Sequence, residues 1–159
     1  MSSSKRIYLV EDDELVAETL GIILERSGYV ITTYADAESA IFQVVQSAPD
    51  LVLSDVSLAG KMTGFELADE IAGSYPEVKV MLMSGAADVP GLLGKQLPPS
   101  MPYRVHAKPI LPMWLLGELA RVLAEVPCGG TQSEDSPGAS PSHSTSSISN
   151  PSQGKKLTS

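Results

Sequence analysis

Residues 5–126 alternate between short apolar runs and longer segments whose apolar side chains recur at helical spacing. Runs this short predict buried strands, and a helical segment between consecutive strands favours parallel pairing, because a parallel crossover needs about a dozen residues or more. We therefore predict an α/β fold, a doubly wound five-stranded parallel sheet with helices on both faces. The predicted strands are IYLV (7–10), YVITTY (29–34), LVLS (51–54), VKVMLMS (78–84) and YRVHA (103–107).

The segments between these runs carry signals for the starts and ends of helices. The exception is residues 85–102, where four prolines and three glycines interrupt any helix. We expect a degenerate helix there, at most a short turn around 88–96. The other signals are Leu15 to Leu24 with a stop at Gly28, a stretch capped by Asp36, residues 64–73, and a last helix opened by Pro112, with Trp114 and the following leucines on its inner face.

The composition changes at Pro127. Residues 127–159 consist mainly of serine, proline and glycine with scattered apolar residues. Such a segment cannot bury enough apolar surface to offset the entropy that it loses on ordering. We predict a flexible N-terminus over residues 1–4, one domain over residues 5–126, and a disordered tail over residues 127–159.

Charge and cysteine content restrict the partners and the compartment. The formal net charge is -8, and an acidic surface repels the phosphate backbone of nucleic acids. No apolar stretch approaches the roughly 18 residues of a membrane span, and the single cysteine favours a reducing compartment. We expect a cytoplasmic protein that binds neither nucleic acid nor membrane.

Polar side chains follow four of the five predicted strands, at the point where each strand ends. In an open parallel sheet, ligands bind beyond the carboxyl ends of the strands. These ends meet at one edge, so the polar groups are expected to form one cluster. In chain order they are Glu11, Asp12 and Asp13, then Asp55, then Ser84, then Lys108.

This combination of residue types predicts phosphoryl chemistry. Clustered carboxylates repel one another unless a cation neutralises them, and oxygen ligands of this kind suit Mg²⁺. Lys108 can act as a point charge for phosphate, and Ser84 can donate to a phosphoryl oxygen. The carboxylate of Asp55 can then be the nucleophile that accepts the phosphoryl group.

Four stretches carry a resemblance to a known family: YLVEDDE, LVLSDVSLAGKMTGFEL, VMLMSG and HAKPI. Over residues 5 to about 125 the chain resembles the receiver domain of two-component response regulators. The resemblance implies the flavodoxin-like strand order 2-1-3-4-5 and assigns Asp13 to helix capping. It also implies site roles: Mg²⁺ ligands Glu11, Asp12 (direct) and Asp55, the backbone carbonyl of Ser57 as a further ligand, Asp55 as phosphoacceptor, Ser84 as the hydroxyl and Lys108 as the lysine.

The chain departs from the family pattern in two places. Ala59 stands where members often carry proline, in a loop to Gly64 that is one residue longer than usual. Val105 stands where an aromatic is frequent, and Tyr103 lies two residues earlier, on the same side of the strand. We therefore expect that signalling does not use the usual serine-to-aromatic switch and that residues 85–102 become ordered instead.

The resemblance implies a response regulator. Because the tail over residues 127–159 lacks a helix-turn-helix pattern, a basic patch or a catalytic motif, we expect it to act as a stand-alone module and not as an enzyme. It would accept a phosphoryl group from a histidine kinase or phosphotransfer protein onto Asp55 and signal through contacts with an output protein that the sequence does not identify. A phosphate sink or a relay intermediate is the alternative reading.

Two further classes are less well supported. A Mg²⁺-dependent phosphatase with an aspartyl nucleophile resembles a pattern with a second Asp two residues later, and Ser57 occupies that place here. A receiver that no longer accepts phosphate is disfavoured because the required set is intact, namely Asp12, Asp55, Ser84 and Lys108.

Overall fold

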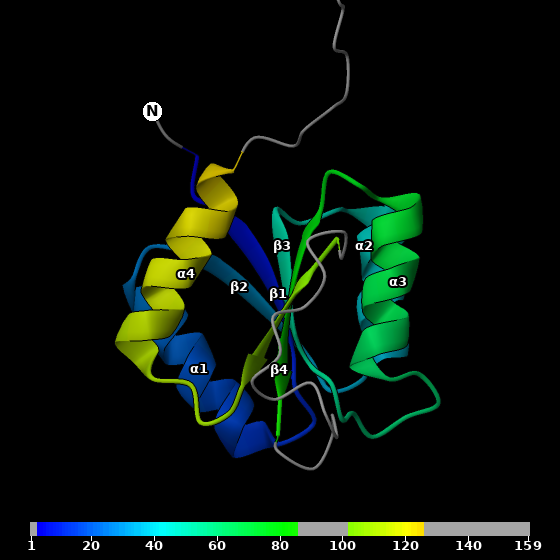
Figure 1. Ribbon diagram of the computed structural model, residues 1–159, viewed down its shortest axis with the longest axis horizontal. Coiled ribbons are helices and arrows are strands. Elements are labelled where there is room, and N and C mark those ends of the chain that lie inside the picture. The colour runs from blue at the N-terminus through cyan, green and yellow to red at the C-terminus, as the bar shows by residue number, and fades with distance from the viewer. Residues whose placement is uncertain (1–2, 86–101, 126–159) are drawn as a thin grey trace, which may run out of the picture. The chain divides into compact units, whose positions relative to one another are not determined.

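The computed structural model describes residues 3–85 and 102–125, and its five parallel strands form a sheet in the order β2-β1-β3-β4-β5. The predicted fold class and strand order are thereby confirmed. The strands are β1 (Arg6–Val10), β2 (Val30–Tyr34), β3 (Leu51–Asp55), β4 (Lys79–Ser84) and β5 (Arg104–Ala107). The helices are α1 (Glu14–Arg26), α2 (Ala37–Gln46), α3 (Gly64–Ser74) and α4 (Pro112–Ala124) (Figure 1).

Some expectations concern residues outside these ranges. The short turn around 88–96, the ordering of most of residues 85–102 and the disordered tail at 127–159 all lie outside the described residues. They stay predictions.

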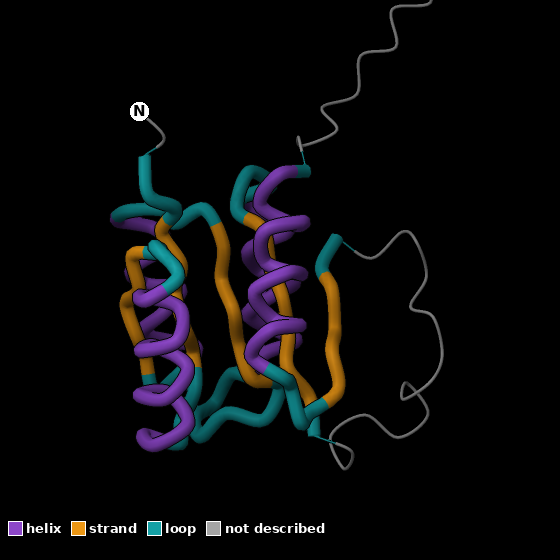
Figure 2. Tube along the Cα trace, turned by 90° about the vertical axis from the view of Figure 1, so that its left-hand side faces the viewer, coloured by secondary structure: helices purple, strands orange, loops and turns teal. Residues whose placement is uncertain are grey.

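Each face of the sheet has its own apolar core, because side chains alternate along the strands. In β1, Tyr8 and Val10 pack with α2 and α3, whereas Ile7 and Leu9 pack with α1 and α4. Figure 1 shows these two helix pairs on opposite sides of the sheet, and Figure 2 shows helices in front of and behind the strands. The central strand β3 is buried at every position. Burial of one large aliphatic side chain contributes ~1.5–3 kcal/mol to the stability of the fold. Apolar packing on both faces therefore holds the strands in place.

Side chains cap the helices that begin where strands end. Asp13 caps α1 and Asp36 caps α2, as predicted, each accepting a backbone N–H from the first turn. Thr63 caps α3 in a reciprocal capping box with Glu66. Pro112 occupies the first turn of α4, where its missing N–H costs nothing. These caps set the points at which the chain leaves the polar edge of the sheet.

The last helix differs from the expectation in the position of Trp114. Leu115 and Leu119 are buried in the core shared with α1, but Trp114 is 45% exposed. Its ring lies edge-on against His106 of β5, with ring centroids 4.6 Å apart. The prediction that Trp114 lies on the inner face was wrong, because the edge strand β5 gives the ring an aromatic partner beside the buried stripe.

Tyr103 precedes β5 and packs into the same core as Val105, on the face that the sequence predicted. Its hydroxyl donates to Asp69 Oδ1 on α3 at 3.0 Å. Burial, with this hydrogen bond to a carboxylate, raises the pKa of Tyr103 to about 12. The phenol is therefore a neutral, fixed donor that ties β5 to α3.

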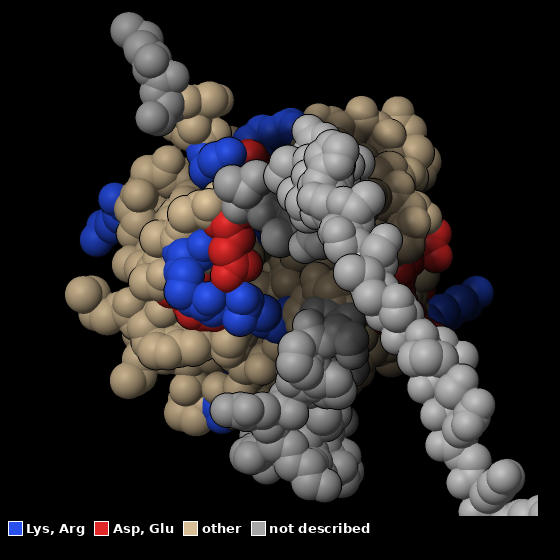
Figure 3. Space-filling view, turned by 45° about the horizontal axis from the view of Figure 1, so that its top comes forward, with Lys and Arg blue, Asp and Glu red and all other residues tan. Residues whose placement is uncertain are grey.

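Figure 3 shows basic and acidic side chains next to one another on one face of the molecule. The ion pairs of α4 have this character: Glu125 accepts from Arg104 at 2.8 Å and from Arg121 at 2.9 Å. Exposed pairs of this kind contribute only ~0.2–1 kcal/mol each to stability.

Within residues 3–85 and 102–125, no helix has the length and apolar character needed to cross a membrane.

Gly64 begins α3 and lies against the backbone that leaves β3. A Cβ atom at this position would fall 2.1 Å from the carbonyl oxygen of Asp55 and 2.8 Å from the Cα of Val56. The N–H of Gly64 donates to the Val56 carbonyl at 2.9 Å. The first turn of α3 thus contacts the chain next to Asp55 at a distance that only glycine permits.

We expect Gly64→Ala to lower the free energy of unfolding by about 3 kcal/mol or more, because backbone atoms cannot yield as a side chain can. Gly73→Ala in the same helix is the matched control. Nothing lies within 4 Å of a Cβ at that position, so it should raise stability by about 0.5–1 kcal/mol. Urea denaturation measures both. A Gly64→Ala variant as stable as wild type would contradict the close contact.

Candidate functional site

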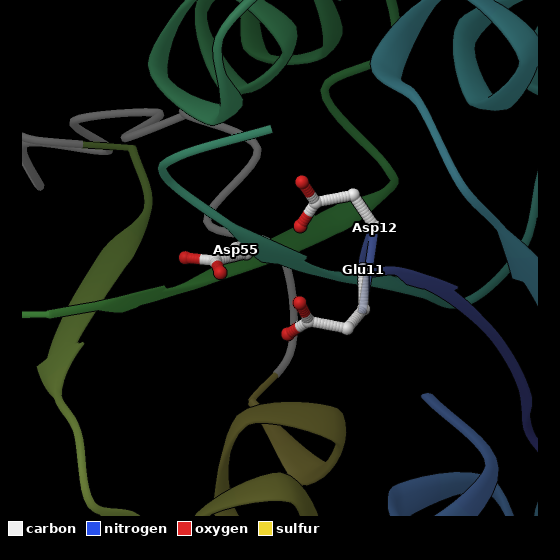
Figure 4. A group of neighbouring side chains, drawn as sticks. All are labelled: Glu11, Asp12 and Asp55. Carbon is white, nitrogen blue, oxygen red and sulfur yellow. The ribbon is translucent and has the colours of Figure 1, made fainter. Parts of the chain in front are cut away.

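Three carboxyl groups lie together at the edge where the strands end. Glu11 and Asp12 directly follow β1, and Asp55 ends β3, the strand that pairs with β1. Oxygen atoms of the three groups lie within 4.8 Å of one another, and Figure 4 shows the groups turned toward the same side. Glu11 is 4% exposed and Asp55 is 6% exposed, whereas Asp12 is exposed. The strand order therefore brings together acids that are distant in sequence.

Lys108 lies between the two buried carboxyl groups. Its Nζ donates to Asp55 Oδ2 at 2.6 Å and to Glu11 Oε2 at 3.3 Å. The lysine follows β5, so these three residues meet only because β1, β3 and β5 end at the same edge. The lysine side chain remains 32% exposed, and the contact is thus open to solvent on one side.

The pKa shifts in the site have identifiable causes. Burial raises the pKa of the Glu11 carboxyl above its usual range, although the N–H of Asp13 and the Lys108 ammonium oppose the shift. Burial by itself would lower the pKa of Lys108, but the hydrogen bond to Asp55 and the charges of Asp55 and Glu11 outweigh it, so the pKa is raised. Lys108 is therefore fully charged at neutral pH.

Backbone N–H groups of the loop after β3 also donate to the acids. Ser57 N–H donates to Asp55 Oδ1 at 3.3 Å, and Ala59 N–H donates to Asp12 Oδ2 at 3.2 Å. Ser57, whose carbonyl the resemblance assigns to the metal, is thus next to Asp55. Ala59, the departure from the usual proline, supplies an N–H that proline lacks.

Ser84 ends β4 at the same edge and is 2% exposed. Its hydroxyl donates to the Gly85 carbonyl at 3.1 Å, so this donor is not directed at Asp55 in the structure. Its own carbonyl accepts the N–H of Lys108 at 2.7 Å. Ser84 is thereby connected to the lysine through the backbone.

The donor set is suited to a divalent cation. Three carboxylates against one ammonium leave a formal charge of −2 in the site. Like charges at this separation repel, and a cation bound by oxygen ligands relieves the repulsion. Glu11, Asp12 and Asp55 could hold a metal ion, with Ser57 beside them.

Glu38 also contacts the loop, and sequence reasoning missed it. This side chain of α2 accepts the N–H groups of Lys61 and Met62 at 2.7 and 3.2 Å. An acid in the first turn of a helix is usual because it favours the helix dipole. The sequence therefore gave no signal that Glu38 reaches a different loop.

Comparisons with known proteins agree with this geometry. The sequence model of the response regulator receiver domain family matches residues 7–93 of the chain. The nitrogen assimilation regulatory protein NtrX of Azorhizobium caulinodans is 33% identical over 84 residues, which are 52% of this chain and 18% of that protein. The transcriptional regulatory protein FixJ of the same species is 30% identical over 90 residues, 57% of this chain and 42% of that protein.

Among solved structures, the receiver domain of NtrX from Brucella abortus matches with a TM-score of 0.63 at 28% identity. The match covers 74% of this chain and 97% of that chain. The chain spans less than half the length of each of these two regulators, NtrX and FixJ of Azorhizobium caulinodans.

We expect Lys108→Met to lower the free energy of unfolding by about 2 kcal/mol at pH 7 in metal-free buffer. This is less than the ~3–5 kcal/mol of a fully buried pair, because the lysine is partly solvated. A raised lysine pKa stabilises the fold below the unfolded value of about 10.4, and the contribution is lost as the pH rises through the folded value. The difference in the free energy of unfolding between wild type and Lys108→Met should therefore be constant from about pH 7 to pH 10 and should shrink above about pH 10.

The double variant Asp55→Asn/Lys108→Met is the control for this ion pair. Removing both charges leaves fewer unpaired ions than removing the lysine alone. The double variant should therefore be more stable than Lys108→Met, with a coupling energy of about 1–2 kcal/mol. Strictly additive effects in urea denaturation would show that the 2.6 Å contact contributes nothing.

Proposed function

The chain belongs to the response regulator receiver domain family, and we propose that it accepts a phosphoryl group on Asp55. The observation that carries the proposal is the contact of the buried Asp55 carboxylate with Lys108 at 2.6 Å, within a cluster of acids. The donor would be the phosphohistidine of a histidine kinase or phosphotransfer protein. The output would be a change in contacts with another protein, as part of two-component signalling.

We further propose that Mg²⁺ is the cation of this site. Receiver domains typically bind Mg²⁺ at an acidic pocket, and the oxygen donors here suit it. Glu11, Asp12, Asp55 and the carbonyl of Ser57 are the residues that would hold the ion. When bound, it supplies positive charge that offsets the site's formal −2 and the charge of the phosphoryl oxygens.

The residues of the chain account for the transfer step. A carboxylate oxygen of Asp55 forms a bond to phosphorus, the bond between phosphorus and the imidazole nitrogen breaks, and its electron pair returns to the imidazole. Lys108 neutralises the negative charge on the phosphoryl oxygens, since its Nζ already contacts Asp55 Oδ2. The hydroxyl of Ser84 becomes a further donor to the phosphoryl group if it leaves the Gly85 carbonyl.

Exposed apolar side chains near the site support a protein as phosphodonor. Leu15 in the first turn of α1 is 72% exposed, and Leu111 and Met113 at the start of α4 are 70% and 83% exposed. These residues follow Asp12 and Lys108 within a few positions. A donor protein that buries them would gain apolar contact beside Asp55.

A Mg²⁺-dependent aspartyl phosphatase is the alternative from a different class. It needs an acid to protonate the leaving alcohol, and Ser57 stands two residues after Asp55 where that class carries Asp. We propose that the chain is not an enzyme of this kind. Steady hydrolysis of an aryl phosphate over many turnovers would contradict this. A phosphate sink or relay role uses the same acceptor chemistry, and stand-alone action stays a prediction.

Asp55 is expected to be the phosphorylation site. Incubation with acetyl phosphate and Mg²⁺ should add the mass of one phosphoryl group, as measured by intact-protein mass spectrometry. The adduct should be absent with a chelator, because the site's uncompensated carboxylates repel the anionic donor. It should also be absent in Asp55→Asn. A stable adduct that persists in Asp55→Asn would place the phosphoryl group on another residue.

Asp12→Ala is expected to weaken Mg²⁺ binding by about tenfold or more, a loss of at least ~1.4 kcal/mol. The same change should raise the thermal midpoint in metal-free buffer, because it removes one of three mutually repelling carboxylates. Isothermal titration calorimetry and thermal denaturation measure the two effects. Glu70→Ala, at an exposed acid of α3, is the control. An unchanged Mg²⁺ titration for Asp12→Ala would remove Asp12 from the proposed ligands.

A further inference from the structure

The loop from Val56 to Thr63 carries the residues that directly follow Asp55. Its two ends are fixed by the fold. Val56 N–H donates to the Met83 carbonyl of β4 at 2.8 Å. At the other end, Thr63 donates its N–H to Glu66 at 2.7 Å within the capping box of α3.

Carboxylates hold the middle of this loop. Ala59 N–H donates to Asp12 in the site, and the N–H groups of Lys61 and Met62 both donate to Glu38 Oε1. The loop is thus held between an acid of the proposed metal site and an acid outside it. Without Glu38, these last two N–H groups would lose their acceptor.

The second carboxylate oxygen of Glu38 shows that the fit is tight. Oε2 is buried and has no hydrogen-bond partner among the described residues. It lies 2.9 Å from the point that a Cβ on Gly60 would occupy. The glycine therefore makes the space in which the glutamate reaches the loop.

We propose that Glu38 is a positioning residue of the phosphoacceptor site. It fixes the backbone at Lys61 and Met62 and thereby places Ala59 N–H on Asp12 and the Ser57 segment beside Asp55. The inference rests on the proposed function and deepens it. Glu38 accepts hydrogen bonds from the loop backbone at Lys61 and Met62. Its effect would therefore pass through that backbone, where a misplacement of ~1 Å can cost up to ~10²-fold in rate.

The test compares Glu38→Ala and Glu38→Gln with wild type, and uses Glu18→Ala as the control of an exposed helical glutamate. The readouts are amide hydrogen exchange of residues 57–62 in metal-free protein, the Mg²⁺ dissociation constant, and the rate of phosphorylation by acetyl phosphate. For Glu38→Ala, exchange at Lys61 and Met62 should accelerate by about tenfold or more, equivalent to ~1.4 kcal/mol. Mg²⁺ binding and the phosphorylation rate should each fall by about tenfold.

Glu38→Gln separates hydrogen bonding from charge. A glutamine carbonyl oxygen can accept both N–H groups, although neutral hydrogen bonds are roughly half as strong as charge-assisted ones. The Mg²⁺ dissociation constant and the phosphorylation rate of this variant should therefore stay within about threefold of the wild-type values. Glu18→Ala should match wild type. If Glu38→Gln is as impaired as Glu38→Ala, the effect comes from charge and the positioning role is refuted.

Gly60→Ala perturbs the same contact from the other side and covers the case in which Glu38→Ala does not fold. Its Cβ displaces Oε2, so it should impair the site by itself but add little to Glu38→Ala. Additive losses would overturn the inference, as would normal Mg²⁺ binding and phosphorylation in both single variants.

If wild type neither binds Mg²⁺ nor accepts phosphate, the proposed function fails. Amide hydrogen exchange of residues 57–62 would still test the contact of Glu38 with the loop.

Discussion

The contact of one ammonium group with two buried carboxyl groups is the interaction on which the rest of the site depends. Glu11 follows β1 and Asp55 ends the adjacent strand β3. The two carboxylates would repel each other at the sheet edge without Lys108 between them. The strand order makes this contact possible, because the switch point between β1 and β3 opens the edge where ligands bind in such sheets. Burial raises the pKa of the Glu11 carboxyl, so desolvation opposes the ionised form of this acid beside Asp12 and Asp55.

Backbone N–H groups form the second part of the site's electrostatics. The loop after β3 directs N–H groups at Asp55, Asp12 and Glu38. Donors of this kind are fixed by the fold and need no reorganisation when charge changes nearby. The longer loop and the alanine at position 59 therefore have a physical consequence, since a proline there could not donate to Asp12. The residue that departs from the family pattern, Ala59, thus donates a hydrogen bond to an acid of the site.

Sequence reasoning reached the fold and the strand-end residues because both follow from local patterns. Alternating apolar runs specify parallel strands, and a polar residue after each run needs only the sheet's polarity to be placed. Two side chains were beyond this reasoning. Trp114 has the helical spacing of a core residue, but it is exposed and its ring lies against His106 of the edge strand β5. Glu38 looks like an ordinary first-turn acid, and its partners lie in a loop whose path is set by tertiary packing.

If Asp55 accepts a phosphoryl group as proposed, the Ser84 hydroxyl is a second group that would respond to it. Its hydroxyl donates to the Gly85 carbonyl, so turning it toward a phosphoryl group would break one hydrogen bond of ~1 kcal/mol before a charge-assisted one of ~1.5–3 kcal/mol forms. The N–H of Lys108 is fixed to the Ser84 carbonyl, and the lysine's Nζ is fixed to Asp55. A phosphoryl group that draws both side chains would therefore act on the ends of β4 and β5 together. The differential free energy for a change of state would come from these two contacts, because a ligand shifts an equilibrium only by what it gains in one state over the other.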